Sequence, residues 1–129
     1  MSTILLSIKP EYSHKILAGE KKYEYRKRVA HDKVDTIIIY SSAPDMKVVG
    51  KVKVLEIISG SPTYIWESTK AYAGITREKF REYFRGIGKA YAYKLGNPEI
   101  FEPAQTLSAY NIQVAPQSFV YIDKDKRTC

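Results

Sequence analysis

Cysteine and histidine are scarce in this 129-residue chain. The one cysteine, Cys129, is the last residue, and the two histidines, His14 and His31, are well separated. A lone thiol excludes an intramolecular disulfide and suits a reducing compartment, so we expect a cytoplasmic protein. Three such ligands in all exclude a closed structural zinc site of the Cys/His type. We expect neither a metal nor a cofactor.

Long hydrophobic runs are also missing. No stretch approaches the ~20 apolar residues of a membrane-spanning helix. The opening "MSTILLSIKPEYSHK" has no basic region before its apolar run and no small-residue cleavage site, so we expect no signal peptide and no membrane partner. Without repeats or low-complexity segments, the length predicts a single domain over residues 1–122, with a frayed charged tail at 123–129.

Acidic residues are outnumbered. The chain has 21 Lys and Arg against 14 Asp and Glu, a formal charge of +7 and a pI near 9.4. Such a surface attracts polyanions, which makes RNA or another nucleic acid the expected partner. A regulatory module whose basic face meets an acidic protein is a different class that the charge also allows. We expect a monomer or a weak dimer.

The first thirty residues predict a strand, a helix and a second strand. The apolar run 3–8 indicates a buried strand, Pro10 suits the first turn of a helix to Ala18, and Gly19 is the expected stop. From 22 to 28 the residues alternate, so that Glu24, Arg26 and Arg28 share one face of a strand. Charge is therefore gathered on that face.

The remaining pattern is rich in strands. We expect strands at 35–40, 48–58, 89–95 and 118–122, with a bulge or bend at Gly50, and a loop-rich passage after Asn97-Pro98. Ser61 and Thr76 are expected to cap helices at 62–72 and 76–85 that flank the sheet, and a helical turn is expected at 107–110. Because no βαβ rhythm recurs, the fold class is α+β with a small curved or closed sheet.

A family resemblance rests on the G-x-K-x-x-E-x-R pattern of Gly19, Lys21, Glu24 and Arg26. Together with the strand and "KP" before it, the segments "IIIYSS" and "VVGKVKVLEI", and the closing "PQSFVYI", it resembles the ASCH domain of the PUA-like superfamily. The resemblance implies a small mixed β-barrel with flanking helices and a cleft beside this strand. It also implies RNA binding, or action on nucleic acids and nucleosides.

We therefore expect a cleft at this strand that binds RNA or a nucleotide-like small molecule, lined by Lys9, Lys21, Glu24, Arg26, Arg28, Tyr40 and Ser41. Lys21 and Arg26 would hold phosphate or carbonyl oxygens, and Glu24 would accept from a donor group of the ligand. The structural alternative is an ion pair within one strand beside a solvated lysine.

Two further sets of residues extend this hypothesis. Surface cations near the strand would contact a nucleic-acid backbone: Lys22, Lys27 and Lys33. Tyrosines of the predicted strands could stack on bases: Tyr23, Tyr25, Tyr40, Tyr91 and Tyr93.

Enzymatic action is an alternative to binding alone. Some ASCH proteins remove the acetyl group of N4-acetylcytidine with a lysine, a threonine and a glutamate. Only Lys21 matches: Glu24 replaces the threonine, and "AYAG" at 71–74 lies where the glutamate is expected. A metal-free ribonuclease would instead use Lys21 and Glu24 as its acid–base pair. We expect a binding protein rather than an enzyme.

Overall fold

The computed structural model describes residues 2–30 and 33–122. Its elements follow one another as β1 (Ser2–Ile8), α1 (Pro10–Leu17), β2 (Tyr23–Arg26), β3 (Val34–Ser41), β4 (Lys47–Gly60), α2 (Pro62–Thr69), η1 (Lys70–Tyr72), α3 (Arg77–Tyr83), β5 (Ala90–Gln105), η2 (Leu107–Tyr110) and β6 (Phe119–Ile122). The expected α+β class is confirmed. His31 and the predicted tail at 123–129 lie outside the described residues.

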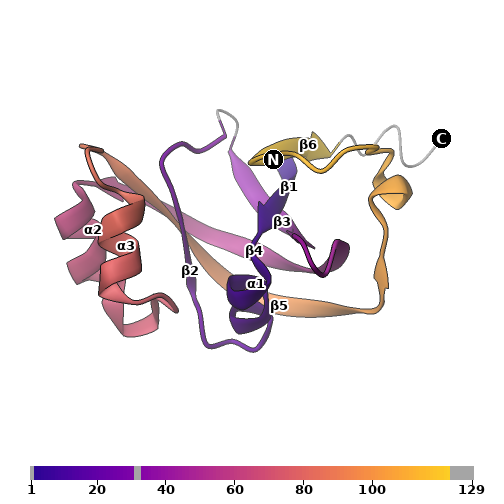
Figure 1. Cartoon of the computed structure of the whole chain (residues 1–129), viewed down its shortest axis with the longest axis horizontal. Helices are drawn as coiled ribbons and strands as arrows, with labels where there is room; N and C mark the ends of the chain where they lie inside the picture. The colour runs from indigo at the N-terminus through magenta and orange to yellow at the C-terminus, as the bar shows by residue number, and fades with distance from the viewer. Residues whose placement is uncertain (1, 31–32, 123–129) are drawn as a thin grey trace.

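The strands form one curved sheet in the order β2-β5-β4-β3-β1-β6. Only β1 and β3 pair in parallel; the other neighbours are antiparallel. Within the described residues β2 and β6 are opposite edges and do not pair, so the expected barrel is in fact an open sheet. Each edge strand is only four residues long, and β2 lies at the end that carries α2 and α3 (Figure 1).

The helices begin and end where local chemistry predicts. Pro10 opens α1, and Gly19 follows it with a φ of 81° that suits glycine. The side chains of Ser61 and Thr76 accept hydrogen bonds from the backbone N–H groups of Tyr64 and Lys79 at the starts of α2 and α3. In the described range no helix has the length and apolarity needed to cross a membrane.

Strand β5 runs much further than expected, because the passage after Asn97-Pro98 is strand and not loop. The pair Lys51–Glu99 is followed by Lys53–Gly96, so β5 has one extra residue at Asn97-Pro98. Proline is tolerated at such a bulge because a residue there need not donate a backbone hydrogen bond to the neighbouring strand. The β4 bulge expected at Gly50 is confirmed on the β3 side, where Ile39 pairs with Gly50 and Tyr40 with Val48, so that β4 has one extra residue. A Cβ on Gly50 would lie 2.3 Å from the Glu99 carbonyl oxygen.

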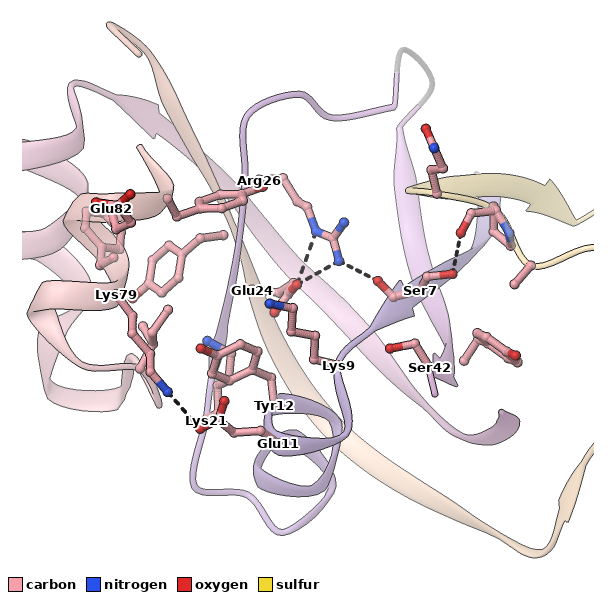
Figure 2. A pocket seen from close by; sticks show the side chains of 18 residues that line it. Ser7, Lys9, Glu11, Tyr12, Lys21, Glu24, Arg26, Ser42, Lys79 and Glu82 are labelled. Carbon is pink, nitrogen blue, oxygen red and sulfur yellow. Dashed lines mark hydrogen bonds and ion pairs between the residues drawn. The ribbon is translucent and has the colours of Figure 1, made fainter. Parts of the chain in front are cut away.

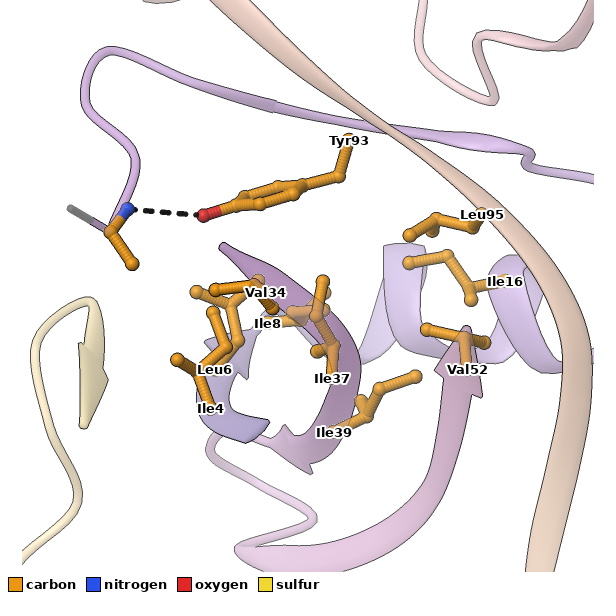
Figure 3. Close-up of a cluster of buried hydrophobic side chains, with 11 residues drawn as sticks. Ile4, Leu6, Ile8, Ile16, Val34, Ile37, Ile39, Val52, Tyr93 and Leu95 are labelled. Atoms are coloured by element: carbon orange, nitrogen blue, oxygen red, sulfur yellow. Dashed lines mark hydrogen bonds between the residues drawn. The ribbon is translucent and has the colours of Figure 1, made fainter. Parts of the chain in front are cut away.

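Three apolar clusters hold the sheet and its helices together. The largest packs Ile16 of α1 against the sheet, with Ile37, Val52 and Leu95 among its members (Figure 3). A second joins Tyr25 of β2 to Phe80 and Phe84 of α3 and Ile65 of α2. The third cluster packs Tyr110 and Ile122 against other buried side chains of β1 and β3. The helices α2 and α3 are therefore a flank packed on the sheet, as expected.

Candidate functional site

The turn from α1 into β2 is held in place from three directions. The N–H of Lys21 donates to the carbonyl of Lys15, the N–H of Lys22 donates to that of Tyr72, and the N–H of Leu95 donates to that of Lys22. Strand β2 then pairs with β5 alone, from Tyr23 to Arg26. It is shorter than the predicted 22–28, so Arg28 lies beyond the strand. The side chains of β2 thus project from a fixed backbone.

Lys21 is a buried lysine, with 2% of its surface exposed. Its Nζ donates to the carbonyl oxygen of Ala73 at 2.6 Å and lies 4.8 Å and 5.2 Å from the ring centres of Tyr25 and Tyr12. Burial lowers the pKa of Lys21 from 10.5 to about 8, although the nearby Glu24 carboxylate acts in the opposite direction. The ammonium therefore loses its proton near pH 8, well below the ordinary pKa of lysine.

The chain leaves no space beside the stem of Lys21 at Gly74. A Cβ on that residue would lie 2.5 Å from both Cβ and Cγ of Lys21, and its φ is 65°. The segment 71–74 that follows α2 thus gives Lys21 a backbone carbonyl from Ala73, while the carbonyl of Gly74 accepts from the Nζ of Lys15 at 3.3 Å.

Glu24 and Arg26 form an ion pair along β2. The Nε and Nη2 atoms of Arg26 donate to Oε2 of Glu24 at 3.1 Å and 2.9 Å, and the two side chains are 14% and 9% exposed respectively. Nη2 also donates to the carbonyl oxygen of Ser7 at 2.8 Å, which links β2 to β1 (Figure 2). The predicted shared face is confirmed for Glu24 and Arg26, whereas Arg28 lies beyond β2.

Behind the pair, Tyr25 belongs to a buried hydrogen-bonded chain. Its hydroxyl lies 2.7 Å from Oγ1 of Thr69, which donates to the carbonyl of Ile65 at 2.7 Å. Burial raises the pKa of Tyr25 to about 12, so the phenol remains protonated. This chain fixes β2 against α2.

These side chains open into a cavity of about 720 Å³, which we name the Lys21 pocket. It lies between α3, β2, the start of α1 and residues 115–117 (Figure 2). Aromatic rings form much of its wall: Tyr12, Tyr25, Tyr40, Phe80 and Tyr83. Four cations line it, Lys9, Lys21, Arg26 and Lys79, against three acids, Glu11, Glu24 and Glu82. Lys79 is paired with Glu11 at 3.2 Å.

Most of the predicted site residues meet in this pocket. Lys9, Lys21, Glu24, Arg26 and Tyr40 line it, whereas Arg28 and Ser41 do not.

Ser41 is fully buried on the side of α1, where its Oγ lies 2.7 Å from that of Ser13 and donates to Asp45 at 2.8 Å. Its neighbour Ser42 lines the pocket instead. Among the tyrosines proposed for stacking, Tyr93 is a core residue, 1% exposed, whose hydroxyl accepts from the N–H of Ala30 (Figure 3).

Sequence reasoning missed the walls that come from distant elements. Ser7 of β1, Lys79 and Glu82 of α3, and Gln117 before β6 all line the pocket. No local pattern marks these residues, because only the tertiary fold brings them beside β2. The sole hint was the "PQSFVYI" segment, which contains Pro116 and Gln117.

Comparisons with known proteins agree with this architecture. The profile of the ASCH domain matches residues 6–105. A protein of Zymomonas mobilis named "ASCH domain-containing ribonuclease" is 26% identical over 126 residues, which cover 95% of this chain and 85% of that protein. A large ribosomal subunit protein uL22 of Ureaplasma parvum is 28% identical over 127 residues, but the match covers only 39% of its length. The crystal structure of ASCH from Zymomonas mobilis superposes with a TM-score of 0.90 at 24% identity, over 98% of this chain and 92% of that one, which shows the common fold.

Proposed function

This chain belongs to the ASCH domain family, and we propose that it binds single-stranded RNA in the cytoplasm, with one unstacked nucleotide in the Lys21 pocket. The observation that carries the proposal is the pocket itself, where a buried lysine and an ion pair face aromatic walls. Its volume of about 720 Å³ lies in the range of small-ligand sites. Unstacked bases are commonly held between aromatic rings and read by polar groups on their edges.

Free donors and acceptors remain in the pocket for such a ligand. An ammonium has three donors, and Ala73 uses one of those of Lys21. Arg26 donates through Nε and Nη2, which leaves Nη1 without a partner in the described range. Oε2 of Glu24 accepts both bonds from Arg26, so Oε1 is left to accept from an exocyclic amine. These groups match a phosphate or carbonyl oxygen and a base edge.

The near balance of charge in the lining favours the nucleoside part of the ligand for this pocket. With four cations and three acids, it is a weak site for a run of phosphates. Contacts to the RNA backbone fall instead to cations outside the lining, Lys27, Arg28 and Lys33. We expect the affinity of the whole RNA to fall with salt, and that of a single nucleoside to change little.

Amide NMR spectra during titration with a short mixed-sequence single-stranded RNA test the proposal. We expect saturable shifts at residues 19–28, at Tyr40 and Ser42, and at Gln117. Lys21→Ala and Arg26→Ala should weaken binding at least about tenfold, the loss of a charge-assisted hydrogen bond. Lys53→Ala, an exposed lysine outside the lining, is the control. Absent shifts, or shifts spread over every lysine, would overturn the assignment.

A second candidate function is metal-independent ribonuclease activity, favoured by the lowered pKa of Lys21 and by the name of the Zymomonas mobilis relative. The 2′-hydroxyl would attack the adjacent phosphorus and lose its proton to Oε1 of Glu24. The P–O5′ bond would break, and Lys21 would give its proton to the leaving 5′-oxygen. The products are a 2′,3′-cyclic phosphate and a free 5′-hydroxyl.

Cleavage of a labelled RNA in excess EDTA distinguishes catalysis from binding. If the ribonuclease assignment is right, the wild-type protein produces the cyclic phosphate and Lys21→Met reduces the rate at least about a hundredfold. A Lys21→Met protein that cleaves as fast as wild type rules out this role of the lysine. If the protein binds the RNA but the RNA stays intact, binding without cleavage remains the proposed function.

The nucleoside amidohydrolase alternative matches this chain only at Lys21. Its resemblance requires a glutamate in the segment 71–74, where Gly74 has no room for a side chain beside Lys21. The Nζ of Lys21 donates instead to the backbone carbonyl of Ala73 in this segment. We therefore do not propose it.

A further inference from the structure

A second cavity, of about 520 Å³, lies beside the Lys21 pocket and shares only Lys21 with its lining. Lys22, Tyr23, Leu55, Tyr72 and Lys94 are among its walls, and we name it the Tyr72 groove. The two cavities meet at the turn into β2, where the consecutive residues Lys21 and Lys22 serve different sites. Apart from Lys21, the residues of this groove take no part in the contacts proposed for the Lys21 pocket.

The groove differs from the Lys21 pocket in charge. Three lysines line it and no acidic residue does, whereas the pocket has three glutamates. In the described part of the chain, neither Lys22 nor Lys94 has a carboxylate within ion-pair distance. Glu56 stands opposite Lys94 in the β4–β5 register, yet the two form no ion pair. The groove therefore carries uncompensated positive charge.

An aromatic ring lies directly beneath one of these cations. The Nζ of Lys22 lies 4.3 Å from the ring centre of Tyr72, whose side chain is 50% exposed. The backbone of the two residues is joined by the Lys22 N–H to Tyr72 carbonyl bond at 3.0 Å, and Leu95 holds Lys22 from the β5 side at 2.9 Å. Exposed Leu55, packed over Gly96, adds apolar surface at the same opening. The ring and the cation are thus presented together on a fixed backbone.

We propose that the Tyr72 groove is a second nucleotide subsite for single-stranded RNA, in which Lys22 and Lys94 contact a phosphate and a base stacks on Tyr72. An ammonium over a ring is attracted only weakly at an exposed site, about 0.5–1 kcal/mol, so a phosphate can draw Lys22 away and free the ring face. Aromatic stacking and nearby cations are the combination that single-strand binders use. This inference rests on the proposed function, because the same RNA occupies both cavities.

The test compares two double variants that remove the same charge. Lys22→Ala/Lys94→Ala removes the groove cations, and Lys51→Ala/Lys53→Ala removes two lysines of β4 that line neither cavity. Fluorescence anisotropy with a labelled single-stranded RNA of about ten nucleotides gives the affinity at several salt concentrations. We expect the groove variant to lose at least about tenfold in affinity and its salt slope to fall by about 1.4 if both lysines contact phosphates.

A second pair of variants tests stacking separately from charge. Tyr72→Ala should weaken RNA binding at least about fivefold, and Tyr64→Ala, which removes a tyrosine of similar exposure on α2, should leave it unchanged. Circular dichroism checks that all four variants are folded.

The outcomes separate the two proposals. If the wild-type protein binds no RNA, the proposed function fails first. If wild type binds and Lys21→Ala weakens binding, but the groove and control variants behave alike, only the second subsite is wrong.

Discussion

The ammonium of Lys21 donates to the carbonyl oxygen of Ala73 across 2.6 Å, although the two residues lie 52 positions apart. The bond joins the first residues of the family pattern to the segment that leads into α3. The lysine thereby gains one fixed acceptor in an otherwise aromatic surrounding, with Tyr12 and Tyr25 beside it. Burial of Lys21 among these groups both holds its side chain in place and lowers its pKa.

Stability should rise with pH between 8 and 10 because of Lys21. Its pKa is lowered from 10.5 to about 8, so in this interval the unfolded chain binds more protons than the folded one. The cost of burying the charge is full below pH 8 and disappears as the lysine deprotonates. We expect the free energy of unfolding of wild type to gain about 2 kcal/mol over that of Lys21→Met across this interval.

Urea titrations at successive pH values measure this difference. The interval ends near pH 10 because the raised pKa of Tyr25, about 12, makes stability fall with pH above that point. Parallel pH curves for the two proteins would contradict the lowered pKa.

Two glycines with left-handed backbones offer a matched pair of substitutions. Gly74→Ala adds both backbone strain and a collision with the Lys21 stem, whereas Gly86, with a φ of 76°, has no atom within 4 Å of an added Cβ. We expect Gly86→Ala to cost about 1 kcal/mol and Gly74→Ala about 3 kcal/mol, because overpacking is added to strain. Chemical denaturation measures both changes in the free energy of unfolding. Equal costs would show that the Lys21 side chain moves aside without a penalty.

The Glu24–Arg26 pair should behave as a coupled unit. Removing the guanidinium alone, as in Arg26→Met, leaves a carboxylate that is 9% exposed without its partner and should cost about 3 kcal/mol. The double variant Glu24→Gln/Arg26→Met should cost clearly less than the sum of the single changes. A double-mutant cycle of unfolding free energies gives the coupling, and additive costs would show that solvent screens the pair.

The hydroxyl chain of Tyr25 and Thr69 predicts an asymmetry. Because the Thr69 proton goes to the carbonyl of Ile65, Tyr25 must be the donor between the two hydroxyls. Tyr25→Phe leaves Thr69 bonded to its carbonyl acceptor and should lower the free energy of unfolding by about 1 kcal/mol. Thr69→Val leaves the buried Tyr25 hydroxyl without an acceptor and should lower it by about 2 kcal/mol. Thermal unfolding compares them, and the reverse order would mean that the protons run the other way.

Most helices and strands could be predicted from local sequence signals. Pro10, Ser61 and Thr76 start helices because each meets the needs of a first turn, and Gly50 bends β4 as its lack of a side chain suggested. The errors come from tertiary effects. Asn97-Pro98 resembles a loop locally, but β4 supplies a partner on both sides of the bulge, and closure of the sheet depends on edges that no local pattern describes.

The site divides in the same way. The alternation of β2 places Glu24 and Arg26 together, and the family pattern marks Lys21, so these could be predicted. Burial of Lys21 could not, because it depends on Ala73 and Gly74, which approach only in the folded chain. Ser41 and Ser42 are adjacent in sequence yet face opposite sides of the strand end, and the sequence alone does not say which of them meets the pocket.

The pairing of β2 has a consequence for synthesis on the ribosome. This strand has one neighbour, β5, whose Tyr91–Lys94 segment is translated long after Tyr23–Arg26. Until it emerges, the strand that bears Glu24 and Arg26 has no hydrogen-bonded partner, and such distant pairing also slows folding. A nascent chain released before Lys94 therefore carries the complete family pattern but has no assembled pocket.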